Sequence, residues 1–211
     1  MRILSLFLTL FLPLCVFAST SVIAEPQNQA VVLPIENSKD AQEFFGSLHD
    51  FPHTFSFEVK DQQQFKAEIY AGDTDEQKND VSIIIVKQER RGVSEVGRTI
   101  ITNQTWHAER DTLLAESFRT GGALTSDLKP GKYKLEVSSP NNEGIYRLVL
   151  GTEKVHRGYF ANVRALFAVK ALFGHSKFGA LLSPLIYIPL LLVSIIGGLY
   201  YLHRKRKVET V

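Results

Sequence analysis

Two histidines four positions apart are the residues of this sequence best spaced to bind a metal ion. His49 and His53 enclose Asp50 and Pro52 in the segment HDFPHTF. On a helix, this spacing would point both imidazoles at one metal ion. Proline disfavours a helix here, and no other ligand follows close by in the sequence. We therefore expect surface histidines at the start of a strand and no metal site.

A cluster of acidic residues offers a second set of conceivable metal ligands. The segment GDTDEQKND contains Asp73, Asp75, Glu76 and Asp80, and calcium binds carboxylate oxygens of this kind. The segment lacks the spacing and the glycine of a calcium-binding loop. The sequence thus predicts a solvated loop at this place, and it predicts no cofactor for the chain.

Motifs for covalent or phosphate chemistry are missing from the sequence. It contains no G-x-S-x-G nucleophile elbow, no phosphate loop and no G-x-G-x-x-G turn that opens a helix. His175 and Ser176 are adjacent, but neighbours in sequence do not make a catalytic pair. We expect no catalytic residues and a protein that is not an enzyme. Catalytic residues dispersed along the chain are the alternative.

The single tryptophan is the residue best suited to bind a sugar. Trp106 precedes His107 in the segment NQTWHAER. On a loop, its indole could be a platform on which a ligand stacks, whereas a lone tryptophan can equally fill a core. Both interpretations of Trp106 stay open.

Charge is distributed unevenly along the chain. Residues 25–152 contain 14 Lys and Arg against 20 Asp and Glu, a net charge of −6. Residues 153–179 contain 5 basic residues and 1 acidic residue. An acidic domain is poorly matched to phosphate backbones, which argues against nucleic acid as a partner. The basic residues flank apolar segments, so the predicted partner is a lipid bilayer.

The N-terminal residues 1–24 are predicted to be a signal peptide. Arg2 precedes an apolar run from Ile3 to Phe17, and small residues follow up to Ala24. The run has 15 residues, fewer than the roughly 20 that cross a bilayer, so we expect cleavage rather than an uncleaved anchor. The only cysteine, Cys15, lies in this run, and cleavage would leave a domain without thiols.

The segment 180–202 is predicted to be a transmembrane helix, because its 23 residues carry no charge. Pro184 and Pro189 lie in its first half, where we expect a tolerated kink. Residues 203–211 form a short basic tail, which predicts a cytoplasmic C-terminus, a single-pass type I topology and the bacterial inner membrane. The membrane-interface candidates at this end are Tyr200, Tyr201, Arg204, Lys205, Arg206 and Lys207.

The residues between these two segments predict strands. Alternating apolar and polar residues at 53–59, 64–70, 132–137 and 145–150 indicate half-buried strands. The run 81–86 indicates a central strand, and 31–35 an edge strand. Residues 97–106 and 112–118 are weaker strand candidates. We expect a loop at residues 87–97 and a helical turn capped by Ser38 at residues 38–46. The strands on either side of SSPNNEG are expected to pair as a hairpin. For residues 25–152 we predict an all-β antiparallel sandwich of jelly-roll-like form.

The order HTFSFEV, QFKAEIY, DVSIIIV and PGKYKLEVSSPNNEGIYRLVLG, over residues 50–151, resembles the bacterial pre-peptidase C-terminal domain. The resemblance implies a jelly-roll-like β-sandwich. It also implies a non-catalytic appendage that aids secretion, localisation or the binding of proteins and sugars. This chain departs from the family's usual setting, because it has no protease and carries a membrane segment.

Residues 153–179 change to helical periodicity and predict a basic amphipathic helix. Its membrane-interface candidates are Phe160, Arg164, Phe167, Lys170 and Phe173. Such a helix could lie in the lipid headgroup layer, with Arg and Lys reaching phosphates. It could instead pack under the sandwich or dock against a membrane protein.

Three functions are compatible with these patterns. The expected one is a membrane-anchored, non-catalytic binding or accessory module for a protein partner in the cell envelope. The first alternative is a carbohydrate or cell-wall binding module, suggested by Trp106 and the family resemblance. The second is an enzyme with dispersed catalytic residues.

Overall fold

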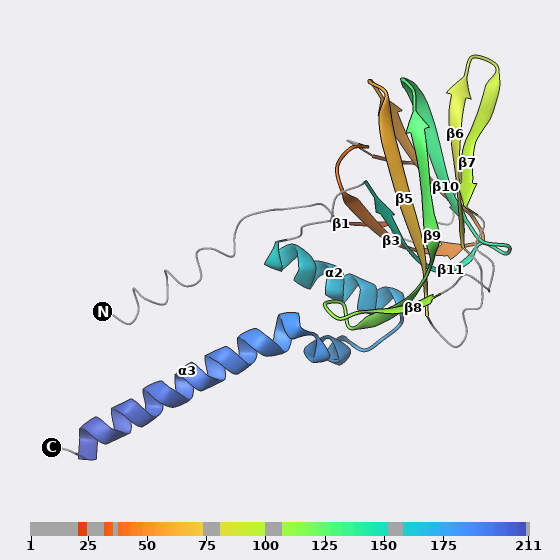
Figure 1. Ribbon diagram of the computed structural model, residues 1–211. Coiled ribbons are helices and arrows are strands. Elements are labelled where there is room, and N and C mark those ends of the chain that lie inside the picture. Colours follow the sequence, from red (N-terminus) through yellow and green to blue (C-terminus); the bar gives the residue numbers. More distant parts are fainter. Residues whose placement is uncertain are drawn as a thin grey trace.

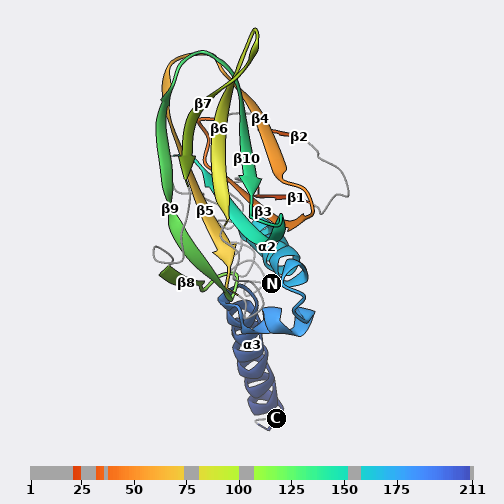
Figure 2. The same ribbon diagram turned by 90° about the vertical axis from the view of Figure 1, so that its right-hand side faces the viewer.

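A computed structural model describes residues 21–24, 32–35, 38–73, 81–99, 107–151 and 158–209 of the chain. These residues form a mostly β domain of two antiparallel-rich sheets, followed by a long apolar helix (Figures 1 and 2). The predicted all-β sandwich is therefore confirmed. Within each sheet, neighbouring strands pair antiparallel except at one edge, where a short N-terminal strand pairs parallel.

Both sheets are built from strands that are distant in sequence. The six-stranded sheet has the order β1 (Ser21–Ala24), β3 (Gln42–His49), β11 (Glu143–Leu150), β5 (Gln63–Gly72), β9 (Glu116–Leu128) and β8 (His107–Asp111). The five-stranded sheet has the order β2 (Val32–Pro34), β4 (His53–Val59), β10 (Gly131–Ser138), β6 (Ser82–Glu89) and β7 (Gly92–Thr99).

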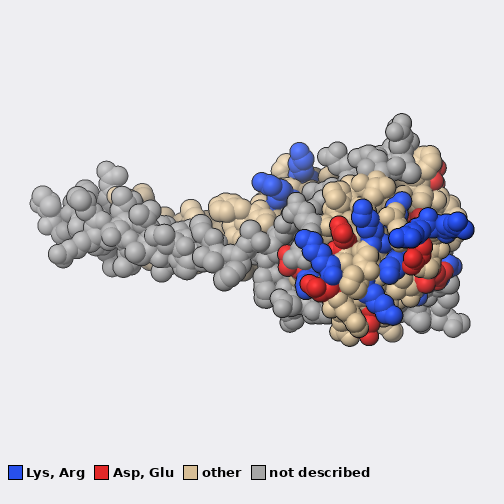
Figure 3. All heavy atoms as spheres, turned by 90° about the horizontal axis from the view of Figure 1, so that it is seen from above, with Lys and Arg blue, Asp and Glu red and all other residues tan. Residues whose placement is uncertain are grey.

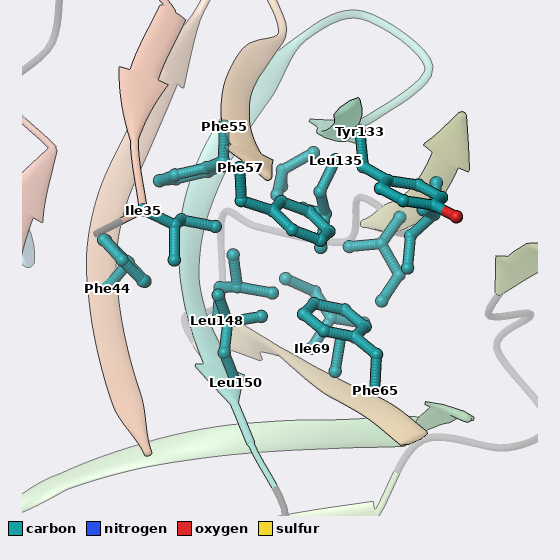
Figure 4. Packing of buried hydrophobic residues seen from close by; sticks show 14 of the residues in the cluster. Ile35, Phe44, Phe55, Phe57, Phe65, Ile69, Tyr133, Leu135, Leu148 and Leu150 are labelled. Atoms are coloured by element: carbon teal, nitrogen blue, oxygen red, sulfur yellow. The ribbon is translucent and has the colours of Figure 1, made fainter. Parts of the chain in front are cut away.

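The core lies between the two sheets, and the alternating sequence pattern explains it. In the central strands one face is apolar and buried, as in β4, where Phe55 and Phe57 point inward. Aromatic rings interlock across the gap, with Phe57 stacked between Phe65 and Tyr133 at centroid distances of 4.9 and 5.6 Å (Figure 4). Burial of these side chains drives the packing of the sheets.

The strands on either side of SSPNNEG do not form the expected hairpin. β10 pairs with β4 and β6, whereas β11 pairs with β3 and β5 in the other sheet. The polar segment between them therefore crosses the sandwich from one sheet to the other. Alternation shows which face of a strand is buried, and both strands bury that face in the same core. It does not show which strand pairs with which, so the hairpin prediction is wrong.

Other local predictions also need correction. Residues 38–46 contain no helical turn, because β3 begins at Gln42 and its Phe44 enters the core. The Ser38 hydroxyl accepts a hydrogen bond from Gln63 instead of capping a helix. β7 begins at Gly92, within the expected loop, after a two-residue turn from β6. The continuous apolar run in β6 is fully buried on one face only, because Ile84 is half-buried on the other.

The edge-strand prediction for residues 31–35 is confirmed, since β2 lies at the edge of the five-stranded sheet. At the edge of the other sheet, β1 pairs with β3. β1 occupies the last four residues of the predicted signal peptide 1–24, so cleavage after Ala24 would detach this strand. Residues 1–20 lie outside the described part.

A helical layer covers the outer face of the six-stranded sheet. It consists of α2 (Tyr159–Leu172), the 3-10 helix η2 (Lys177–Leu182) and the turn at residues 112–115, and we call these three segments the basal layer. From η2 the chain continues into α3 (Pro184–Glu209), which runs away from the sandwich (Figure 1). The expected helix 180–202 is thus shorter at its start, because residues 180–182 belong to η2, and Pro184 begins α3 rather than kinking it.

Candidate functional site at the base of the sandwich

The basal layer is fastened to the sheet through an apolar cluster of its own. On α2, Ala165, Leu166 and Val169 lie on one face and are buried. They pack in a cluster with Phe45 of β3 and Phe118 of β9. This arrangement agrees with the alternative in which the helix packs under the sandwich.

Lys170 is buried against the sheet and does not reach lipid phosphates. Its ammonium donates hydrogen bonds to Glu116 Oε1 at 2.6 Å and to the Ala115 carbonyl at 2.9 Å. A charge at such a position is tolerated because an opposite charge neutralises it. Phe173 also turns inward, with its ring edge-to-face against Phe118 at 5.5 Å. The membrane-interface prediction is therefore wrong for Lys170 and Phe173.

The end of α2 directs a histidine to the same carboxylate. Gly174 has a left-handed φ of 64°, which glycine adopts without strain. Its N–H bonds to the Ala171 carbonyl and the N–H of His175 bonds to the Lys170 carbonyl, the two bonds of a Schellman motif. This turn brings His175 Nδ1 to 2.7 Å from Glu116 Oε1. Glu116 thus joins β9 to both α2 and the chain that follows it.

Two further hydrogen bonds attach the start of α3 to the basal layer. The buried Ser183 hydroxyl donates to the Leu113 carbonyl at 2.5 Å. The Tyr159 hydroxyl, at the start of α2, donates to the Leu185 carbonyl at 2.9 Å. Because Leu113 lies in the turn before β9, the first turn of α3 is bonded on two sides.

Beneath α2, one arginine organises charge and aromatic rings on the sheet. Arg147 of β11 forms ion pairs with the fully buried Glu43 and with Asp111, the latter at 3.3 Å. Its guanidinium also lies 5.2 Å from the ring centroid of Tyr70 and 5.5 Å from that of Phe118. These contacts neutralise the charge of the guanidinium. They also fix the positions of the rings on which α2 packs. Burial, followed by the hydrogen bond to Glu68, raises the pKa of Tyr70 to about 12.

The histidine pair expected at the surface is divided between two environments. His49 is exposed, but His53 is buried, and its Nδ1 lies 2.7 Å from the Tyr146 hydroxyl. Burial, with a smaller effect of His49, lowers the pKa of His53. Gly46 makes this contact possible, because a Cβ there would lie 2.6 Å from the Tyr146 hydroxyl oxygen. The surface prediction is wrong for His53.

The remaining predicted site residues, as far as the structure describes them, do not meet at one site. Phe160, Arg164 and Phe167 form an exposed stripe on α2 opposite its buried face. Tyr200 and Tyr201 are exposed on α3. The side chains of Arg204, Arg206 and Lys207 lie outside the described part, although their backbone continues α3, and Lys205 is exposed there. Trp106 and the acidic residues 75–80 also lie outside the described residues.

At the base of the sandwich, buried charged groups bond to one another across elements. Among the described residues, no three His, Cys, Asp or Glu side chains are grouped so that they could hold a metal ion. Lys170 of α2 and Glu116 of β9 form such a buried ion pair. Their geometry can join a helix to a sandwich.

Sequence reasoning missed Glu43, Glu116 and Arg147. Each belongs to a stretch read as an ordinary strand or turn, where a charge on alternate positions indicates the solvent face. The outer face of this sheet is covered by α2, so the charges there are buried and paired. The sequence contained one signal that this face is covered, namely an apolar residue on the same face as the charge. Phe45, two positions after Glu43 on β3, is an example.

Comparisons with known proteins concern the sandwich alone. No family model and no curated protein matches the chain. Among solved structures, the pre-peptidase C-terminal domain of a collagenase from Bacillus anthracis is similar, with 14% identity, a TM-score of 0.37, and coverage of 59% of this chain and 97% of that one. A surface-associated copper-binding protein of Methylomicrobium album has 6% identity, a TM-score of 0.34, and coverage of 59% and 98%.

A carbohydrate-binding module from a Cellvibrio mixtus lichenase is also similar, with 14% identity, a TM-score of 0.26, and coverage of 52% of this chain and 71% of that one. A pre-peptidase C-terminal domain, the family that the sequence resembles, is therefore among these solved structures, at low similarity.

Proposed function

We propose that this protein is a single-pass, membrane-anchored ectodomain without catalytic activity, which binds a protein partner in the cell envelope. The observation that carries the proposal is the exposure of α3. Its 19-residue apolar span, Pro184–Leu202, is long enough to cross a bilayer, and none of it is buried against the rest of the chain. Large apolar side chains such as Leu191 and Leu192 face outward around the helix. In water, such a surface would be strongly unfavourable.

The orientation follows from the flanking residues. Positive charge concentrates after Leu202, which favours a cytoplasmic C-terminus and an ectodomain on the other side, in a bacterium across the inner membrane. Pro189 inside α3 is compatible with a bilayer, where Pro is tolerated in spanning helices.

A protein partner is favoured over nucleic acid by the surface of the sandwich. Basic and acidic side chains alternate over the face shown in Figure 3, without a broad field of one sign. On β10 and β4, for example, Lys132 lies opposite Glu58. This face lacks the basic stripe that phosphate backbones require.

Extraction of membranes tests the anchoring. The full-length protein is expected to stay in the pellet after alkaline carbonate treatment. Two charges in the middle of α3, Val193→Lys with Ile195→Lys, are expected to release it, because each costs about 2.5–3.5 kcal/mol at the centre of a bilayer. Leu202→Lys at the end of the span is the matched control and should stay in the pellet. Release of the unaltered chain would overturn the proposal.

Cross-linking in intact cells tests the partner. A photoreactive amino acid at position 132 or 134, on the outer face of β10, is expected to give one discrete cross-linked protein. The same group at position 191, within the proposed span, is the control and should give a different pattern. Repeated absence of any discrete product from positions on both sheets would contradict partner binding.

A further inference from the structure

Exposed apolar side chains outside α3 gather at the base of the sandwich. Among the described residues outside α3, nine large hydrophobic side chains are exposed, and six of them belong to the basal layer. The three most exposed of the nine all lie there, Phe178 at 80%, Phe160 at 74% and Leu182 at 74%. The other three, Val32, Phe51 and Val93, lie singly on the sandwich, as is usual for surface apolar residues. The six in the basal layer are Leu113, Phe160, Phe167, Phe178, Leu181 and Leu182.

The backbone of η2 is held so that its apolar side chains must point away from the sandwich. Ala180 is buried in the cluster beneath α2, and Ser183 is bonded to Leu113. In a 3-10 helix, residues three apart share a face, which places Phe178 and Leu181 together. With Ala180 turned inward, Phe178, Leu181 and Leu182 form the outer surface of η2.

This surface lies beside the beginning of α3. Both ribbon views show η2 next to the first turn of α3, with the sandwich rising on the opposite side (Figures 1 and 2). The bond from Tyr159 to Leu185 brings the start of α2, and with it Phe160, to the same level. The exposed apolar residues therefore surround the point at which α3 begins.

The bilayer that holds α3 is the occupant that fits this surface. The apolar surface of η2 is continuous with that of α3, whose span begins at Pro184, two residues after Leu182. Exposed cations, Arg164 and Lys177, stand among the apolar side chains and suit lipid phosphates. Phenylalanine and leucine beside cations are typical of segments that lie in the headgroup region.

We propose that Phe160, Phe178, Leu181 and Leu182 insert into the interfacial layer of the leaflet in which α3 begins, and that they hold the sandwich in one orientation on the membrane. The inference rests on the proposed anchoring by α3. It assigns the membrane contact to η2 and the start of α2, whereas the buried stripe of α2 is committed to the sandwich.

Spin labels on the full-length chain in lipid nanodiscs test this inference. Replacing the single cysteine, Cys15→Ser, allows one label at a time through Phe178→Cys, with Val93→Cys on β7 and Leu191→Cys on α3 as references. Each label is assessed for its accessibility to oxygen, which concentrates in lipid, and to a water-soluble nickel complex. Phe178 is exposed, so its replacement leaves the packing of the sandwich unchanged.

The label at 178 is expected to show an oxygen-to-nickel accessibility ratio several-fold above that at 93 and below that at 191. A ratio at 178 equal to that at 93, with 191 still in lipid, would overturn the inference and leave the anchoring intact. A label at 178 shielded from both reagents, with spectral broadening that dilution by unlabelled protein removes, would assign the surface to a second copy and also overturn it. Water-like values at 191 would overturn the anchoring itself.

Discussion

At the residue scale, buried polar groups of the interior find partners on other elements. His53 meets Tyr146 between the sheets, and Lys170 meets Glu116 beneath α2. Each pair joins elements that lie far apart in sequence. Buried polar groups of this kind specify one arrangement only if each finds its partner. These side chains therefore help to specify the fold.

His53 makes the stability of the sandwich depend on pH. Its pKa is lowered below 6.5 in the folded state, first by burial and then by His49, so the unfolded chain takes up a proton at a higher pH than the folded chain. The contribution of neutral His53 to the free energy of unfolding is fully present above pH 6.5 and is lost as the pH drops below it. We expect the free energy of unfolding to decrease between pH 7 and pH 5 through this group.

Urea unfolding in detergent, followed by the circular dichroism of the β-structure, measures this effect. His53→Gln, which keeps a hydrogen-bonding group near Tyr146, should remove that part of the pH dependence. His107→Gln, at an exposed position on β8, is the control and should retain it. An unchanged pH profile in His53→Gln would contradict the assignment.

At the element scale, α2 shows how one amphipathic helix can present two different surfaces. Its buried stripe consists of small and branched side chains that pack on Phe45 and Phe118. Its exposed stripe carries Phe160 and Phe167, which are larger. A pattern of this kind resembles that of a helix lying on lipid, but here the sheet takes up one side. The helix is thereby a third layer of the fold.

Adjacent residues of α2 allow a matched test of this layer. Leu166→Ala removes a fully buried side chain and is expected to cost about 2–5 kcal/mol in the free energy of unfolding. Phe167→Ala removes a larger but exposed side chain and should change it by less than about 1 kcal/mol. Chemical unfolding in detergent measures both. Equal effects of the two substitutions would show that α2 does not pack on the sheet.

At the scale of the whole molecule, the basal layer makes the sandwich and α3 one connected body. Ser183, just before α3, bonds to Leu113 in the turn before β9, and Tyr159 of α2 bonds to Leu185 in the first turn of α3. Glu116 of β9 in turn bonds to Lys170 of α2 and to His175. A domain on a flexible linker would sample many orientations relative to α3, whereas this connection allows few. The outer face of the five-stranded sheet is thus held at a fixed angle to α3.

Distance measurements between two spin labels test this rigidity. Labels at positions 93 on β7 and 199 on α3, in the Cys15→Ser chain, are expected to give one narrow distance distribution. Ser183→Ala removes the bond to Leu113 and should broaden the distribution. Ser194→Ala is the control, because its hydroxyl bonds only to Leu190 within α3 and should leave the width unchanged. A broad distribution in the unsubstituted chain would show that the sandwich moves independently.

Local patterns were sufficient for several of the strands and for the apolar helix, but not for β3 and β7. Period-two alternation identified β4, β5, β10 and β11, because a strand with one buried face has apolar residues at every second position. A long uncharged run identified the span that begins at Pro184, because the length needed to cross a bilayer is a local property. The acidic and basic parts of the chain were also visible without a structure.

Tertiary structure alone decided which strands pair, which face of α2 is covered and where the buried charges meet. β10 and β11 entered opposite sheets, and Lys170 turned from lipid to Glu116. These outcomes depend on partners tens of residues away, such as the 54 positions that separate Glu116 from Lys170. Alternation and charge describe one residue and its near neighbours, whereas pairing is a choice among distant partners made by the packing of the whole chain.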